Sequence, residues 1–134
     1  DEGIEYEADP RQAEKFIRDL KFDGGVKAVA TPGVKVTQEQ IDGDRALHPA
    51  KIGPYRSVVA RGNYLAADRP DCQYSSKEVC RWMSAPMSTA MAGLKRLGRY
   101  LEGQRRLIIK YSWQRAAAKP ANRPREDASC WAPT

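Results

Sequence analysis

Histidine, cysteine and long apolar runs are all scarce in this chain of 134 residues. The three cysteines, Cys72, Cys80 and Cys130, include no CxxC pair, and His48 is the only histidine. This pattern argues against a disulfide framework or a zinc site and favours a reducing intracellular setting, with cytoplasm and nucleus both open. Mean hydropathy is -0.69, so we expect no membrane-spanning segment and no membrane partner. His48 has no nucleophile in a recognisable turn beside it and is expected to be a loop residue.

The N-terminal residues lack the features of a secretory leader. Residues 1–15 mix charges without an apolar centre, and the chain does not begin with Met. We therefore expect a piece of a longer polypeptide.

Closely spaced carboxylates are also few. Two-metal nucleotidyl transfer needs aspartates in a turn such as Y-x-D-D, and no such turn occurs. Asp42 and Asp44 lie in a stretch without a preceding apolar strand, which predicts plain loop. Asp68 and Asp71 stand three apart at a helix start, which predicts helix capping. We expect no catalytic residue, no metal site and no cofactor in this chain.

What the chain does have is helical periodicity between residues 53 and 103. Three segments each carry one apolar stripe, and two short junctions that contain proline separate them. The stripes consist of Tyr55, Val58, Val59, Gly62 and Ala66, then Cys72, Ser76, Val79 and Met83, then Met87, Met91, Leu94, Leu97 and Leu101. The second segment is expected to end near residues 84–86, with Ser84 capping the third. Short connections favour close packing, so the pattern predicts a three-helix bundle over about residues 54–102.

The remaining segments complete a mainly α fold with minor β structure. Residues 1–33 read as a strand-helix unit, with a strand over residues 2–8 and a helix from Asp9-Pro10 to about Phe22. Residues 34–52 show no sustained period and are expected to be a loop or linker. Residues 104–113 include a β-prone run that predicts a strand, and residues 114–134 read as a flexible tail.

The net charge of +6 is unevenly distributed. Residues 1–24 hold eight acids and four bases, whereas residues 93–125 hold ten bases and one acid. A basic field of this kind attracts polyanions, and the alternative is a solvated surface that binds nothing specific. The candidate nucleic-acid-binding residues are Lys95, Arg96, Arg99, Arg105 and Arg106. Most of the aromatic side chains are expected to pack in or near the core rather than to stack on bases.

An ordered series of short motifs runs through the same stretch: Tyr55-Arg56-Ser57, Tyr64-Leu65, Arg69-Pro70-Asp71, Tyr74, Met83-Ser84, Pro86, Leu94-Lys95-Arg96 and Arg99-Tyr100-Leu101. The series resembles the C-terminal part of a copia-type retrotransposon reverse transcriptase, and the resemblance is densest over residues 53–103. It implies the thumb and connection region of a Pol polyprotein, running toward ribonuclease H. The parent enzyme would be an RNA-directed DNA polymerase that uses Mg²⁺.

This resemblance implies two kinds of partner. One is the backbone of an RNA–DNA hybrid or duplex, and the other is the remainder of the Pol polyprotein. The piece itself would lack both the catalytic palm and the ribonuclease H acids, and would help to hold template and primer. The alternative function is a small basic helical interaction module that docks RNA or an acidic protein.

Overall fold

A computed structural model describes residues 2–22 and 25–113, so the expected tail at residues 114–134 lies outside the described residues. The elements in chain order are β1 (Gly3–Glu7), α1 (Pro10–Asp19), α2 (Gln38–Asp42), α3 (Pro49–Ala66), the 3-10 turn η1 (Pro70–Cys72), α4 (Gln73–Cys80), α5 (Ser88–Gly103) and β2 (Ile108–Ser112). The expected fold class, mainly α with a strand-helix unit at the start and a strand near the end, is confirmed.

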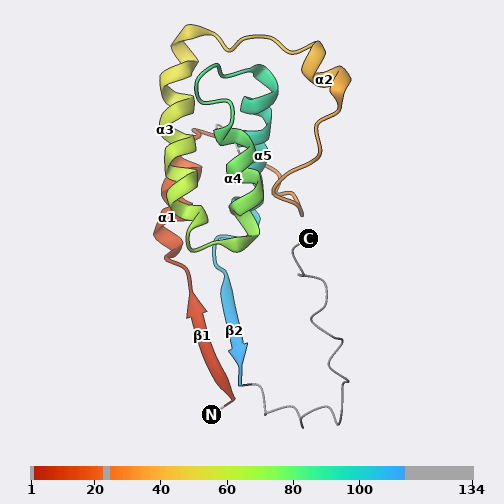
Figure 1. Ribbon diagram of the computed structural model, residues 1–134. Helices are drawn as coiled ribbons and strands as arrows, with labels where there is room; N and C mark the ends of the chain where they lie inside the picture. Colours follow the sequence, from red (N-terminus) through yellow and green to blue (C-terminus); the bar gives the residue numbers. More distant parts are fainter. Residues whose placement is uncertain (1, 23–24, 114–134) are drawn as a thin grey trace, which may run out of the picture.

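The two strands pair with each other, although they lie at opposite ends of the described chain. They are antiparallel, with Gly3 opposite Ser112 and Glu7 opposite Ile108. Figure 1 shows this two-stranded ribbon projecting away from the helices. The sequence predicted each strand but not their partnership, because alternation within a strand says nothing about which strand pairs with it.

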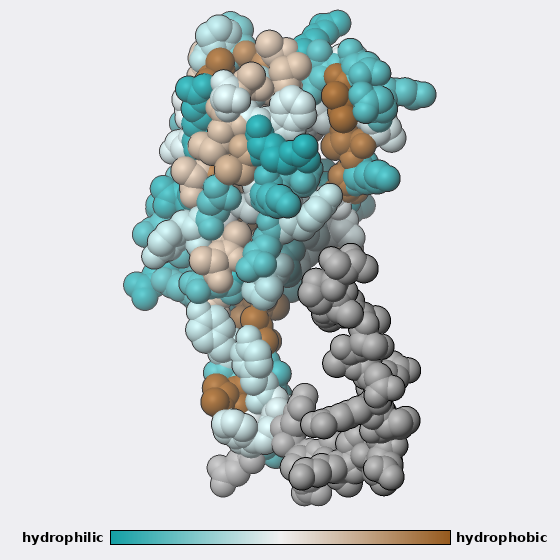
Figure 2. All heavy atoms as spheres, in the orientation of Figure 1, coloured by the Kyte–Doolittle hydropathy of each residue, from teal (hydrophilic) through white to brown (hydrophobic). Residues whose placement is uncertain are grey.

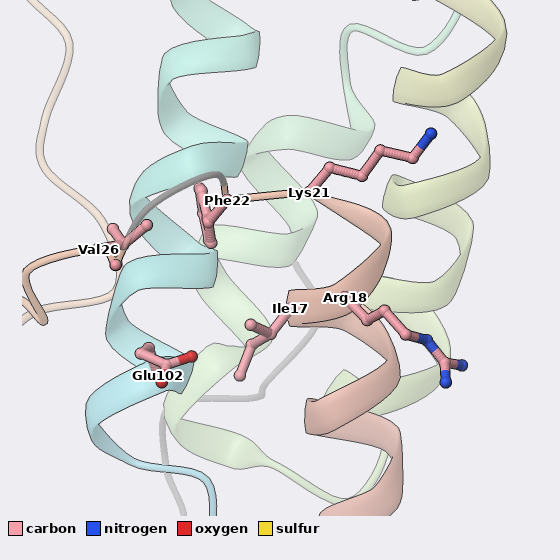
Figure 3. A pocket seen from close by; sticks show the side chains of 7 residues that line it. Ile17, Arg18, Lys21, Phe22, Val26 and Glu102 are labelled. Carbon is pink, nitrogen blue, oxygen red and sulfur yellow. The ribbon is translucent and has the colours of Figure 1, made fainter.

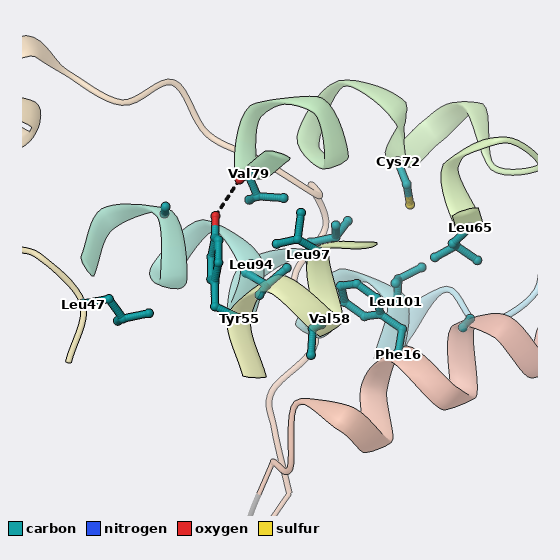
Figure 4. Packing of buried hydrophobic residues seen from close by; sticks show 13 residues of the cluster. Phe16, Leu47, Tyr55, Val58, Leu65, Cys72, Val79, Leu94, Leu97 and Leu101 are labelled. Carbon is teal, nitrogen blue, oxygen red and sulfur yellow. Dashed lines mark hydrogen bonds between the residues drawn. The ribbon is translucent and has the colours of Figure 1, made fainter. Parts of the chain in front are cut away.

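Four helices form the body of the molecule. Helix α1 packs on α3 and α5, α3 packs on α4, and α4 packs on α5, which closes the expected three-helix bundle with a fourth member. The buried cluster includes Phe16 from α1, Val58 from α3 and Leu97 from α5 (Figure 4). All four helices therefore contribute apolar side chains to one core, because Val79 of α4 belongs to the same cluster.

The predicted stripe of α3 is confirmed, since Tyr55, Val58, Val59, Gly62 and Ala66 are all buried. Glycine at position 62 lets two helices approach α3. A Cβ there would lie 3.0 Å from the Phe16 ring of α1 and 3.3 Å from Ser76 Oγ of α4. That close approach offsets the roughly 1 kcal/mol that glycine costs inside a helix.

The expectation that residues 34–52 are a loop is wrong in two places. Helix α2 begins with a capping box, in which Thr37 Oγ1 accepts from the Gln40 amide and the Gln40 side chain accepts from the Thr37 amide. Helix α3 begins at Pro49, with Nδ1 of His48 accepting from the Ala50 amide at 3.2 Å. His48 is thus a helix cap rather than a plain loop residue. Helix α2 and the first turn of α3 each span too few residues to show a period of their own, which is why the pattern missed them.

Two helices end earlier than expected. Helix α1 stops at Asp19, and Lys21 has a positive φ of 47°, so the left-handed turn comes before the glycines. Helix α4 stops at Cys80 instead of near residue 84, because the amides of Trp82 and Met83 turn back to the carbonyls of Val79 and Cys80. Tightened turns of this type commonly close a helix.

Among residues 2–22 and 25–113, no helix combines the length and the apolar character that crossing a membrane requires.

Candidate nucleic-acid interface

Helix α5 carries three of the five candidate basic residues, and its two ends are fixed by other segments. At the start, Oδ1 of Asp44 accepts from the Thr89 amide at 3.0 Å. Ser84, the expected cap, does not perform this role, since Met87 occupies the cap position without a side-chain bond. Burial alone would raise the pKa of Asp44, but hydrogen bonds from Thr89 and neighbouring amides outweigh it and lower the pKa. Asp44 lies outside any helix, as expected, but it also caps a helix that is 45 residues away. Asp42, which was expected to be loop as well, is the last residue of α2.

Arg96 and Arg99 hold a connecting segment against α5. We call residues 25–33 the strap. Nη2 of Arg96 donates to Oγ1 of Thr31 at 2.8 Å, and Nε of Arg99 donates to the Lys27 carbonyl at 2.8 Å. Both arginines are only partly exposed. Arg96 and Arg99 therefore hold the strap in place in addition to giving α5 positive charge.

The other three candidate basic residues lie in different surroundings. Lys95 is exposed on α5. Arg105 donates to Glu102 at 2.6 Å, and Arg106 makes two bonds to Glu7, at 2.6 and 3.0 Å. The Arg106 contact lowers the pKa of Glu7. Carboxylates already pair with Arg105 and Arg106. The five predicted residues therefore form two groups, one of three bases on α5 and one of two acid-paired arginines between α5 and β2.

The arginine of the Arg-Pro-Asp motif is buried. Arg69 is 1% exposed, and its guanidinium makes a two-pronged contact with Asp71, at 3.0 and 2.8 Å. It also donates to the carbonyls of Gln104 at 2.9 Å and Arg105 at 3.3 Å, just beyond the end of α5. The hydroxyl of Tyr100 donates to the same carboxylate at 2.8 Å. This network joins the start of η1 to the end of α5.

The network shifts the acidity of its members. Burial by itself would raise the pKa of Asp71, but bonds from Arg69 and Tyr100 prevail and the pKa is lowered. Burial, followed by the bond to Asp71, raises the pKa of Tyr100 to about 12. The neighbouring Cys72 thiol is buried and has a pKa of about 12, which makes it a poor nucleophile at neutral pH.

Neither aspartate of this junction caps the helix that follows, so the capping expectation is wrong. Asp71 serves the network, and Asp68 accepts from the Tyr6 hydroxyl at 2.9 Å, while η1 and α4 show no side-chain cap. Spacing along the chain could not reveal this, because Tyr6 and Tyr100 come from elements far away in sequence.

Four aromatic side chains that were expected to pack in or near the core are exposed. Tyr64, Tyr74, Tyr111 and Trp113 are all between 58% and 69% exposed, whereas Tyr100 and Trp82 are partly buried. Tyr55 is the aromatic residue of α3 that does enter the core, where its hydroxyl donates to the Val79 carbonyl at 2.5 Å. Tyrosine tolerates both settings because it is apolar along the ring and polar at the tip, so composition alone does not decide its position.

A shallow pocket of about 350 Å³ lies between the end of α1 and the end of α5 (Figure 3). Ile17, Phe22 and Val26 form its apolar lining and Glu102 adds one carboxylate, while Arg18 and Lys21 point away toward α3. The lining includes no histidine, cysteine or serine, so it offers no paired nucleophile and base of the kind that hydrolytic sites use. In the part of the chain that the structure describes, no three acidic, histidine or cysteine side chains gather to hold a metal ion.

Comparison with protein-family models, with curated proteins and with solved structures finds no match for this chain.

Proposed function

We propose that this chain is a piece of a copia-type reverse transcriptase that lies after the catalytic palm and helps to hold the template and primer. The observation that carries the proposal is the ordered series of motifs over residues 53–103. Several residues of that series also hold the bundle together, including Tyr55 in the core and the contact of Arg69 with Asp71. The proposal includes an intracellular setting, and no catalytic residue is assigned to this piece.

The surface proposed for nucleic acid is the α5 edge, which we define as Lys95, Arg96, Arg99 and Lys27 of the strap. Lys95 and Lys27 are exposed, and the backbone of Lys27 is bonded to Arg99, so lysines from two segments flank the two arginines. Arg105 and Arg106 are left out of the edge because their carboxylate partners reduce their attraction for phosphate. Contacts of lysine and arginine with phosphate would position a duplex without reading its sequence.

The first test is genetic. Coding sequence that precedes this segment should specify a Y-x-D-D turn, and coding sequence that follows it should specify the ribonuclease H acids. An open reading frame without both would contradict the proposal.

The second test uses binding of an RNA–DNA hybrid at several salt concentrations. Lys95→Ala should reduce the slope of log affinity against log salt by up to about one unit, with less effect for forms other than B-DNA. Lys77→Ala is the matched control, because Lys77 is an exposed lysine on α4 rather than α5. Both variants should melt like the parent chain, since each replaces a solvated side chain.

Equal salt slopes in the parent and in Lys95→Ala would show that the α5 edge does not touch the polyanion. Equally tight binding of poly-glutamate would favour the alternative, a basic module that docks acidic proteins.

A further inference from the structure

The β1–β2 ribbon has an apolar face that is largely open to solvent. Near the helices the Tyr6 hydroxyl is bonded to Asp68 and Ile109 is partly buried, and the rest of the face is exposed. Side chains alternate across a strand, so the cross-strand pairs Ile4–Tyr111 and Tyr6–Ile109 lie on one face, and Trp113 continues it. Ile4, Tyr111 and Trp113 are each more than half exposed. Figure 2 shows brown and pale side chains along the ribbon where it extends from the helices. A two-stranded ribbon with one such face is at best marginally stable alone, which points to a missing partner.

The pattern on this face is a checkerboard of large and small side chains. Tyr6 and Tyr111 occupy one diagonal, and Ile4 and Ile109 occupy the other. A two-fold rotation about an axis in the plane of the ribbon, either along or across the strands, places each tyrosine over an isoleucine of a second copy. The face is therefore complementary to itself in size, which is what a symmetric interface requires.

The edges of the ribbon are less suited to a partner than its face. In an antiparallel pair, hydrogen-bonded and non-hydrogen-bonded residue pairs alternate. The Ala8 amide donates to the Leu107 carbonyl and the Trp113 amide donates to the Glu2 carbonyl, so Glu5 and Lys110 form a non-hydrogen-bonded pair. The backbone N–H and C=O groups of these two residues therefore point outward from the ribbon. Pairing like edges of two copies would bring Glu5 and Glu7 of β1, or Lys110 of β2, near their own counterparts. Like charges at an edge oppose such pairing, whereas the four side chains of the checkerboard are uncharged.

We propose that two copies of this chain associate through the apolar faces of their ribbons, forming a four-stranded, two-layer sandwich. Sheets packed in this way lie about 10 Å apart, with side chains from both faces interdigitating. The face holds five apolar side chains, with Glu2 at its end opposite Trp113. So few side chains bury less than the roughly 800 Å² per partner of standard-size complexes, so the association is weak and concentration-dependent. This inference does not depend on the proposed function.

Sedimentation equilibrium of the full chain tests the proposal. The parent should shift from monomer to dimer as its concentration rises from roughly 10 µM to 1 mM, the range where weak interfaces assemble. Tyr111→Lys should raise the dissociation constant at least about tenfold, because it buries a charge in the sandwich. Tyr111→Thr should weaken association as well while keeping a residue that favours strands.

The matched control is Tyr74→Lys, which changes another exposed tyrosine, on α4, and should leave association unchanged. Helical circular dichroism and the melting temperature check that every variant is folded. A parent chain that stays monomeric at the highest concentration overturns the proposal, and so does dimerisation that Tyr111→Lys leaves intact. Growth beyond the dimer would mean that the edges pair instead, which also overturns it.

Discussion

Arg69 joins parts of the chain that are far apart in sequence. Its guanidinium contacts a carboxylate two residues away and two carbonyls beyond the end of α5. A planar group with five donors can satisfy all of these acceptors together, which lysine cannot do. A buried cation is tolerated here because its partners compensate for the loss of water.

Removal of this side chain should be costly. We expect Arg69→Leu to destabilise the fold by about 3 kcal/mol or more, because Asp71 and two carbonyls lose their donor in a partly buried place. Arg81→Leu is the control, since Arg81 pairs with Glu78 on the surface and its loss should cost within about 0.5 kcal/mol. Chemical denaturation of both variants measures the difference, and equal midpoints would contradict the structural role of Arg69.

At the scale of the element, two interior glycines of α5 lie in different surroundings. A Cβ on Gly93 would lie 3.5 Å from Cγ1 of Val79, which is ordinary contact. A Cβ on Gly98 would overlap Cδ1 of Leu20 and would come within 2.9 Å of the Phe22 ring. Gly98 is therefore a contact point for the end of α1, while Gly93 is not.

The same substitution at these two glycines should have opposite effects. Gly93→Ala should stabilise the protein by up to about 1 kcal/mol, because alanine favours helix. Gly98→Ala should destabilise it by about 1 to 3 kcal/mol, because Leu20 and Phe22 must move. Melting temperatures of the two variants test this contrast. If Gly98→Ala melts at or above the parent temperature, α1 does not pack tightly on α5.

How well the sequence predicts a helix depends on the length of that helix. Period alone predicted the buried faces of α3 and α5, because long helices repeat the signal over several turns. Period could not predict α2, whose five residues span little more than one turn. Nor could it predict that Asp44 would cap α5, since that contact depends on how the chain folds back.

Prediction of the candidate site was partial for the same reason. The basic residues of α5 were found from charge alone. In the structure the candidate bases fall into three groups. Lys95 is exposed, two arginines hold the strap, and two arginines pair with acids. Which group a residue joins depends on contacts between residues up to 99 positions apart in the sequence. Charge counts along the chain contain no such information.

At the scale of the whole molecule, several buried groups must keep their protons for the fold to persist. Burial raises the pKa of Tyr55, Tyr100 and Cys72 to about 12 each, from ordinary values of 10.0 for tyrosine and 9.0 for cysteine. A group whose pKa is higher in the folded than in the unfolded state stabilises the fold at pH values below its unfolded-state pKa. That stabilisation is lost as the pH rises toward its folded-state pKa.

Stability should therefore fall steadily between pH 9 and about 12, as unfolded chains ionise before folded ones. Thermal melts across this range, with tyrosinate absorbance as a second signal, provide the measurement. Tyr55→Phe should lose stability less steeply with pH, because one of the buried hydroxyls is gone. A melting temperature that stays constant over the range would show that these groups are accessible to water.

The pairing of β1 with β2 has a consequence for the order in which the molecule folds. The ribbon joins residues near the two ends of the described chain, with Glu7 opposite Ile108. Closing a loop of about a hundred residues costs entropy before any strand contact forms, whereas the helices depend mainly on nearer neighbours. The folded bundle shortens that loop by holding α1 against α5. The ribbon is thus the last part to form and the first to open, and its amide hydrogens should exchange with solvent well before those of α5.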